Sequence, residues 1–286
     1  MGYRIPVDAN GWNEAWKARQ ARRDALHGAD FWDERAKSFT TKDAPGCYTD
    51  QFLQMAAVRP GETVFDMGCG TGNLAVPLGA AGHEVCAADF SPVMLDRLRE
   101  ELCHQGITCV RPVQLSWEDD WAAHGIEAQS FDVCVASRSI ATADLGDALA
   151  KLTAVARRRA CITLACGISP RIDDGMLRAI GIEAPPAYDF IYALAILHAR
   201  GFLPELRYIS TERRDTFATV DEAYRKYATM VEAVMRDESP ERARALERLR
   251  AWLDRELTDQ DGALTLRQPR QVPWAFISWD RSAQSA

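Results

Sequence analysis

Short apolar runs alternate with amphipathic segments between residues 63 and 166, and this alternation limits the possible folds more than any other feature of the sequence. Runs of this length that are rich in Val, Ile and Cys are typical of buried strands, whereas the segments between them have helical spacing. Strands that alternate with helices form a parallel sheet with helices on both faces. The pattern therefore predicts an α/β fold with a doubly wound sheet. The five runs are TVFDM, HEVCAAD, ITCVRPV, SFDVCVAS and ACITLAC.

Helices are expected between these strands, the first ending at Ala81 and the second running from Pro92 to about His104. A third is predicted in DLGDALAKLTAVARR. Pro77 lies inside the first helix, where a proline removes a hydrogen bond and should produce a kink. The sequence RRRACIT is expected to contain the turn before the fifth strand.

The segments in front of this core are predicted to be helical and carry several large aromatic residues. They are GWNEAWKARQARRDA, ADFWDERAKSF and GCYTDQFLQMAAV. Trp12 and Trp16 lie four residues apart and so share one helix face. These two rings, together with Phe31 and Trp32, either line an acceptor site or dock the first helices, and we expect docking.

The segments behind the core predict a helix ending at Gly201, a strand in LPELRYISTERRDTF and two further helices. Thr219 and Glu222 fit a capping box at the start of one helix. Ser239 and Pro240 open the other. PWAFISWD reads as the last strand, antiparallel to the others. The residues with helical spacing in the second helix are Leu246, Leu249, Leu253 and Leu257.

Three glycines at alternate positions, Gly68, Gly70 and Gly72, follow the first strand directly. Glycines placed so closely indicate a backbone that takes positive φ angles or lets another group approach. A dinucleotide fingerprint counted from Gly68 would require glycine at residue 73, where the chain has Asn73. The turn reads instead D-x-G-x-G-x-G and begins with Asp66.

This motif, DMGCGTG, closely resembles the first motif of the class I methyltransferases that depend on S-adenosyl-L-methionine (SAM). The specific likeness covers roughly residues 40–166. The whole chain also resembles a group of uncharacterised bacterial small-molecule methyltransferases that share its WDERA-like and YDFIYALAIL-like segments. The resemblance implies a seven-stranded Rossmann-like sheet. It divides the chain into N-terminal helices that are part of a cap (1–58), a SAM-binding core (59–166), and remaining strands with helical insertions that complete the cap (167–286).

The resemblance also implies a set of residues that contact SAM. Asp66 and the turn would meet the ammonium and carboxylate of the methionyl end. Asp89 would accept from both ribose hydroxyls, although it could instead be a helix N-cap ahead of Pro92. Glu118, or Asp119 in another register, would accept from the adenine amino group, unless the segment is a solvated acidic loop. The full cofactor-binding set is Asp66, Gly68, Cys69, Gly70, Asp89, Phe90, Met94, Trp117, Glu118 and Ser137.

The acceptor is predicted to be a small molecule. The fourth strand ends in VASRSIA, without the N-P-P-Y type sequence of enzymes that methylate exocyclic amino groups of nucleobases. A net charge of -7 likewise disfavours a nucleic-acid partner. Arg138, at the end of that strand, needs an anionic partner, which could be the SAM carboxylate, a protein acid or an acid on the acceptor. We hypothesise the last. The candidate catalytic residues are Tyr188, Asp189, Tyr192, His198 and Arg138.

Two other functions are compatible with the motifs, namely a nicotinamide-dependent oxidoreductase and a SAM-binding protein without turnover. The eight cysteines include no C-x-x-C pair, so neither a zinc site nor a disulfide framework is predicted. No apolar stretch approaches the ~20 residues of a membrane span, and no secretory signal is apparent at the N-terminus. We therefore expect a cytoplasmic protein without a metal or a membrane partner, and a homodimer is compatible with the sequence.

Overall fold

The computed structural model describes residues 8–24, 46–167, 169, 172–183 and 188–282. These residues form two compact units. The first lies within residues 1–164, 189–209 and 274–286, and the second within residues 165–188 and 210–273. The predicted helix ADFWDERAKSF, with Phe31 and Trp32, lies outside the described residues.

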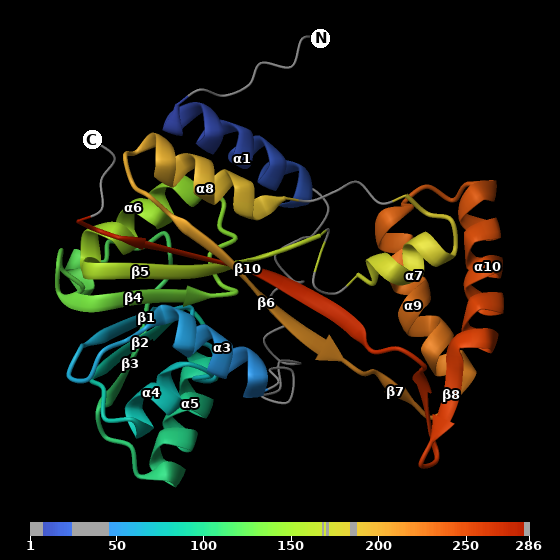
Figure 1. The fold of residues 1–286 in the computed structure, drawn as a ribbon, viewed down its shortest axis with the longest axis horizontal. Helices are drawn as coiled ribbons and strands as arrows, with labels where there is room; N and C mark the ends of the chain where they lie inside the picture. Colours follow the sequence, from blue (N-terminus) through green and yellow to red (C-terminus); the bar gives the residue numbers. More distant parts are fainter. Residues whose placement is uncertain (1–7, 25–45, 168, 170–171, 184–187, 283–286) are drawn as a thin grey trace. The chain divides into compact units, whose positions relative to one another are not determined.

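A seven-stranded sheet with the order β3-β2-β1-β4-β5-β10-β6 organises the first unit (Figure 1). The pairs from β3 through β5 are parallel, and the last strand is antiparallel, as predicted. The strand order reverses beside β1, which places a topological switch point at the carboxyl ends of β1 and β4. The strands are β1 (Val64–Met67), β2 (Val85–Asp89), β3 (Val110–Gln114), β4 (Phe131–Ser137), β5 (Ala156–Ala165), β6 (Glu205–Arg213) and β10 (Arg270–Asp280).

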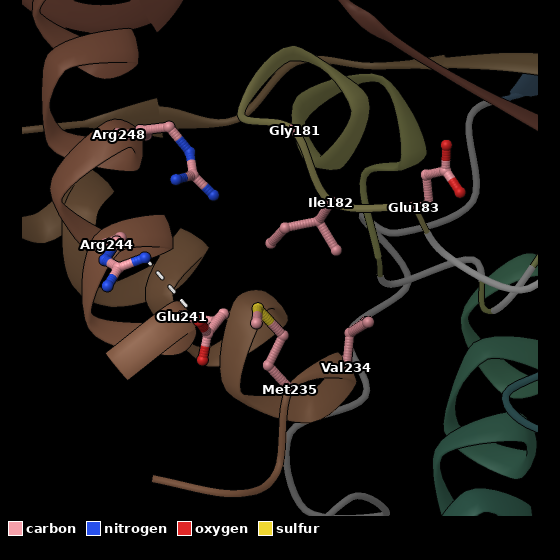
Figure 2. A pocket seen from close by; sticks show the side chains of 8 residues that line it. All are labelled: Gly181, Ile182, Glu183, Val234, Met235, Glu241, Arg244 and Arg248. Carbon is pink, nitrogen blue, oxygen red and sulfur yellow. Dashed lines mark ion pairs between the residues drawn. The ribbon is translucent and has the colours of Figure 1, made fainter. Parts of the chain in front are cut away.

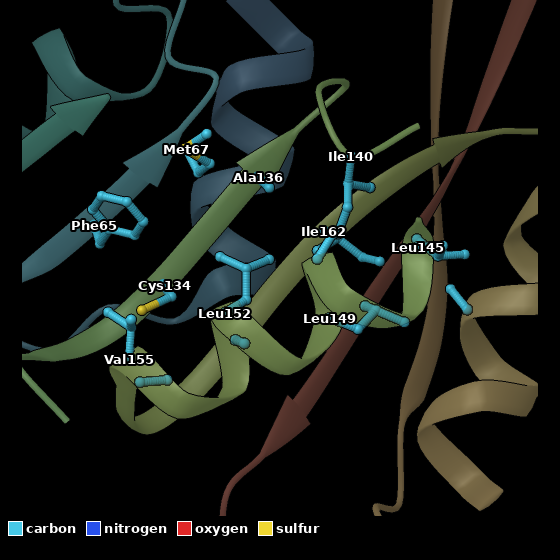
Figure 3. Close-up of a cluster of buried hydrophobic side chains, with 14 of the residues drawn as sticks. Phe65, Met67, Cys134, Ala136, Ile140, Leu145, Leu149, Leu152, Val155 and Ile162 are labelled. Carbon is cyan, nitrogen blue, oxygen red and sulfur yellow. The ribbon is translucent and has the colours of Figure 1, made fainter. Parts of the chain in front are cut away.

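Helices cover both faces of this sheet (Figure 1). On one face, Leu145, Leu149 and Leu152 share a side of their helix and pack with Phe65 and Ile162 of the strands (Figure 3). The helices on this face are α1 (Ala9–Asp24), α6 (Leu145–Val155) and α8 (Asp189–Ala199). Those on the other face are α3 (Gly46–Ala56), α4 (Ala75–Ala80) and α5 (Pro92–Gln105), and a short 3₁₀ helix, η2 (Ala122–His124), follows β3.

The aromatic residues of α1 dock that helix, as expected. The rings of Trp12 and Trp16 contact the ring of Tyr192 edge to face, with centroids 6.0 and 5.8 Å away. The indole N–H of Trp16 donates to the carbonyl of Thr142 at 2.8 Å, so the docking is fixed by a directional bond as well as by burial.

The second unit combines a three-stranded sheet with helices. Both predicted N-caps are present, since Thr219 Oγ1 accepts from Glu222 N and Ser239 Oγ accepts from Arg242 N. The strands, in the order β7-β9-β8, are β7 (Thr216–Phe217), β8 (Leu257–Gln260) and β9 (Ala263–Leu266). The helices are α7 (Asp174–Ala179), α9 (Val220–Val234) and α10 (Pro240–Glu256).

Two local predictions, for Leu257 and RRRACIT, were wrong. Leu257 does not extend the face of α10, because the helix ends at Glu256 and Leu257 begins β8. The kink and lost hydrogen bond expected at Pro77 stay predictions, since the N–H groups on either side of it, those of Val76 and Leu78, donate to the carbonyls of Gly72 and Leu74. RRRACIT contains no turn, because α6 ends at Val155 and the arginines already belong to β5, where Arg159 pairs with Val133.

Cys86, Cys134 and Cys161 are buried and pack as small apolar residues. Within the described residues, no helix is both long and apolar enough to cross a membrane.

Candidate cofactor and acceptor site

The glycines after β1 adopt backbone conformations that other residues rarely take. Gly68, Gly70 and Gly72 have φ angles of +73°, +56° and +93°. A Cβ on Gly68 would lie 2.3 Å from Cβ of Ser139, and one on Gly72 would lie 2.5 Å from Leu98 Cδ1. A Cβ on Gly70 would meet no atom within 4 Å. Packing therefore explains Gly68 and Gly72, whereas Gly70 borders open space that a ligand can enter.

Hydrogen bonds tie the turn to the end of β2. The N–H groups of Gly68 and Cys69 donate to the carbonyl of Ala88 at 2.7 and 2.9 Å. The N–H of Gly70 donates to Asp89 Oδ2 at 2.8 Å. These bonds hold the turn in one conformation before any ligand binds.

Asp66 is a buried carboxylate whose Oδ2 has no hydrogen-bond partner in the described part of the chain. Burial, and then the nearby Asp89, raise the pKa of Asp66 to about 7. An ionised carboxylate is costly to bury without a partner, so this position favours a ligand that brings a positive charge.

Asp89 is 6% exposed and accepts two backbone hydrogen bonds. Its Oδ1 accepts from Ser91 N at 2.9 Å, and its Oδ2 accepts from Gly70 N. Burial raises the pKa of Asp89, and the two N–H bonds partly oppose that shift. Ser91, not Asp89, is the N-cap of α5, since its Oγ accepts from Met94 N. Each carboxylate oxygen has a further lone pair that can accept from a ribose hydroxyl.

The residues predicted around the adenine follow β2 and β3. Phe90 is 58% exposed, and Met94 is buried in the first turn of α5. The indole N–H of Trp117 donates to the carbonyl of Ser139 at 3.0 Å. Glu118 is exposed and bonded to Ser116 Oγ, whereas Asp119 accepts from Ser116 N at 2.7 Å. Asp119 therefore already accepts a hydrogen bond within its own loop, and Glu118 stays the predicted adenine contact.

The carboxyl end of β4 contains contacts that the sequence did not reveal. Tyr48, from α3, is buried, and its hydroxyl lies 2.8 Å from both Ser137 Oγ and Thr163 Oγ1. The guanidinium of Arg138 lies over the ring of Tyr48, 4.4 Å from its centroid. Within the part of the chain that the structure describes, the Arg138 side chain forms no ion pair with an acid. No sequence signal links Tyr48 to Ser137 at the end of β4 or to Thr163 of β5, because these partners lie 89 and 115 residues away.

The candidate bases near α8 have different environments. Asp189 is buried and pairs with Arg19 of α1 at 2.9 Å. Tyr192 packs against the α1 tryptophans. Tyr188 and His198 are exposed. The structure thus assigns structural contacts to Asp189 and Tyr192, and a catalytic role for any of the four stays a prediction.

The second unit contains a pocket of about 370 Å³ (Figure 2). Its two arginines already have partners: Arg248 donates to the carbonyl of Ile180 at 2.6 Å, and Arg244 pairs with Glu241 at 3.8 Å. The first contact ties α10 to the end of α7, and the second lies within α10, so we do not assign the cofactor to this pocket. Its lining consists of Gly181, Ile182, Glu183, Val234, Met235, Glu241, Arg244 and Arg248.

Comparisons with known proteins agree with this geometry. Residues 64–159 match the family model described as a methyltransferase domain. An uncharacterised protein from Haemophilus influenzae is 31% identical over 253 residues, which is 87% of this chain and 88% of that protein. The chain belongs to the class I SAM-dependent methyltransferases. Its cofactor is SAM, which excludes the nicotinamide-dependent alternative.

Two further comparisons are more limited. The crystal structure of the YcgJ protein from Bacillus subtilis superposes with a TM-score of 0.53 at 15% identity, covering 84% of this chain and 99% of that one, so it shares the fold. The 23S rRNA (uracil(1939)-C(5))-methyltransferase RlmD of Alkalilimnicola ehrlichii is 33% identical over 88 residues. That match covers 29% of this chain and 20% of RlmD.

The residues of the site fit SAM. The orphaned Oδ2 of Asp66 offers a partner to the ammonium of the methionyl end. The space beside Gly70 allows a ligand to approach the backbone between Asp66 and Asp89. The exposed ring of Phe90 follows Asp89 directly, where an adenine next to the ribose would need an apolar contact. These assignments remain proposals for the individual residues.

A pair of alanine substitutions tests which glycine lies next to the ligand. Gly68→Ala should destabilise the protein by several kcal/mol, because the new Cβ collides with Ser139 in addition to the strain of about 1–2 kcal/mol from a positive φ. Gly70→Ala should show only the strain, yet it should weaken binding of S-adenosylhomocysteine more than tenfold, because the methyl group enters the ligand space. Urea denaturation and calorimetry measure the two effects. Equal ligand affinity in Gly70→Ala and the unchanged protein would place the ligand elsewhere.

Proposed function

We propose that this methyltransferase methylates a small-molecule acceptor. The observation that carries the proposal is the end of β4, where Ser137, Arg138 and Ser139 stand in place of an N-P-P-Y sequence. The net charge of -7 also supports it, because proteins that bind nucleic-acid backbones use clustered Lys and Arg.

SAM supplies a methyl group on a positively charged sulfur that is already activated for displacement. The task of the chain is to align the reactants and exclude water, an advantage that can reach ~7–11 kcal/mol. In this proposal Asp66 contacts the ammonium of the methionyl end of SAM and Asp89 contacts its ribose hydroxyls. Phe90 and Met94 flank the adenine. A general base is needed only if the acceptor arrives protonated, and Tyr188 and His198 remain the exposed candidates.

The acceptor class can be tested by supplying the protein with SAM labelled on its methyl group. A bacterial extract is divided by ultrafiltration into metabolites and macromolecules, and the macromolecules are divided again by ribonuclease treatment. We expect label in the metabolite fraction. Label in the macromolecular fraction that disappears with ribonuclease would contradict the proposal and favour an RNA acceptor, as in the named activity of RlmD.

A thermal melt with S-adenosylhomocysteine serves as the control for that experiment. A ligand at about a hundredfold excess over its dissociation constant stabilises a native protein by about 2.7 kcal/mol. S-adenosylhomocysteine should therefore raise the melting temperature, and NAD should not. A positive melt without label in any fraction would indicate binding without turnover. The predicted cap and homodimer stay predictions.

A further inference from the structure

Arg138 has an unusual backbone conformation for its residue type. Its φ angle is +60°, in the left-handed region that favours glycine, and it directly follows the last residue of β4. Non-glycine residues in this region persist where surrounding contacts determine the conformation, and such positions cluster at ligand sites. The N–H of Arg138 donates to Thr163 Oγ1 at 3.0 Å. The conformation is therefore held by a bond to the neighbouring strand β5.

Tyr48 reinforces this bond. Its hydroxyl bridges Ser137 Oγ and Thr163 Oγ1, so one side chain from α3 connects the last residue of β4 with the acceptor of the Arg138 N–H. Both Tyr48 and Thr163 are buried. Hydrogen bonds without competing water hold their geometry closely. Tyr48 is thus in position to fix the backbone from which the Arg138 side chain projects.

The guanidinium of Arg138 lies on an aromatic platform and not on a carboxylate. Its carbon is 4.4 Å from the ring centroid of Tyr48 and 5.8 Å from that of Trp274, and the two rings meet edge to face. A cation over a ring face keeps the N–H donors at the edge of its plane available. Among the described residues those donors have no acceptor. A planar fork of this kind matches a carboxylate with two parallel hydrogen bonds.

Arg138 also borders the glycine turn. The next residue, Ser139, occupies the space beside Gly68, and its Oγ donates to the carbonyl of Met67 at 2.6 Å. In the order β2-β1-β4, Arg138 lies on the opposite side of Asp66 from Asp89. If the ribose is at Asp89 and the ammonium at Asp66, the ligand beyond them at β4 is the acceptor.

We propose that Arg138, held by Tyr48 and Trp274, binds a carboxylate of the acceptor, an inference that rests on the proposed small-molecule function. Arg138 is a binding residue and Tyr48 is a positioning residue. The group that Arg138 would bind is a carboxylate, and SAM carries a carboxylate as well. The test therefore has to separate the carboxylate of the acceptor from that of the cofactor.

The experiment measures the affinity of the protein for two ligands by calorimetry. The first is S-adenosylhomocysteine, titrated into the protein alone. The second is benzoate, titrated into the protein saturated with S-adenosylhomocysteine, with the neutral benzamide as its matched probe. We expect the wild-type complex to bind benzoate at least tenfold more tightly than benzamide. Failure of S-adenosylhomocysteine to bind would count against the proposed function, whereas normal binding of it without a preference for benzoate would overturn only this inference.

Three variants test whether Arg138 binds the carboxylate and whether Tyr48 positions it. Arg138→Gln removes the charge, and Arg138→Gly removes the side chain while accepting the left-handed backbone, so the latter should fold at least as well as the wild type. Both should lose the preference for benzoate and keep S-adenosylhomocysteine affinity within about twofold. Tyr48→Phe keeps the ring but loses the hydroxyl bridge, and should weaken benzoate several-fold with little effect on the cofactor product. A large loss of S-adenosylhomocysteine affinity in Arg138→Gly would assign Arg138 to the cofactor carboxylate and overturn the proposal.

Discussion

Replacing Asp89 with alanine should weaken SAM binding at least tenfold. The proposed role of this carboxylate is to accept from both ribose hydroxyls, and hydrogen bonds to a charged group contribute about 1.5–3 kcal/mol each. Loss of a single such bond already corresponds to about a tenfold change in affinity. Isothermal titration of the variant with SAM measures the effect directly.

The same substitution should also lower the free energy of unfolding. Asp89 accepts from Gly70 N and Ser91 N, and alanine leaves both donors without this acceptor. A buried donor without a partner costs about 1–3 kcal/mol, so we expect a fold that survives with reduced stability. Asp89→Asn keeps one acceptor oxygen in the same place and should lose less stability than Asp89→Ala.

Ser91→Ala provides the matched control for Asp89. It removes the N-cap bond to Met94 N, at a cost of about 1 kcal/mol, and leaves the carboxylate of Asp89 intact. Its SAM affinity should stay close to that of the wild type. Unchanged affinity in Asp89→Ala as well would show that Asp89 only ties Gly70 and Ser91 to the end of β2.

The parts of the fold that the sequence predicted depend on local patterns. The five parallel strands follow from apolar runs separated by helical spacing, and the turn follows from three closely spaced glycines. The hairpin of β8 and β9 was missed, although Asp261 and Gly262 form a pair typical of a tight hairpin turn and both have positive φ angles. The leucine spacing of α10 continued into this segment and favoured a longer helix.

The missed parts of the site depend on contacts between distant segments. Tyr48 was assigned only to a helix, because nothing in GCYTDQFLQMAAV indicates that its hydroxyl meets Ser137 and Thr163. The surroundings of Arg138 were equally inaccessible, since its aromatic platform combines α3 with β10. The sequence identified the charged group that needs a partner, and only the packing shows which partners within the protein are present.

Asp66→Asn should increase stability and weaken SAM binding, and both effects should depend on pH. Burial and Asp89 raise the pKa of Asp66 from 3.8 to about 7 in the free protein. The native state therefore binds more protons than the unfolded state between about pH 4 and pH 7, and stability falls as the pH rises through that range. A shift of one pKa unit corresponds to 1.36 kcal/mol, so between about pH 4 and pH 7 the free energy of unfolding of the wild type should fall by about 4 kcal/mol. Asp66→Asn has no carboxyl group to ionise here and should not show this fall. Urea denaturation at several pH values measures the difference, which should be small near pH 4.

SAM binding should show the opposite pH dependence. An ammonium beside Asp66 favours the ionised carboxylate, so binding below about pH 7 must release the proton of Asp66. Affinity should then rise by up to about tenfold per pH unit towards pH 7 and level off above it. Asp66→Asn should bind SAM more weakly and without this slope. The charge of Asp89 contributes to the raised pKa of Asp66, so Asp89→Ala should shift the slope to lower pH. A wild-type affinity that stays constant between about pH 5.5 and pH 7 would mean that the ammonium of SAM does not lie beside Asp66.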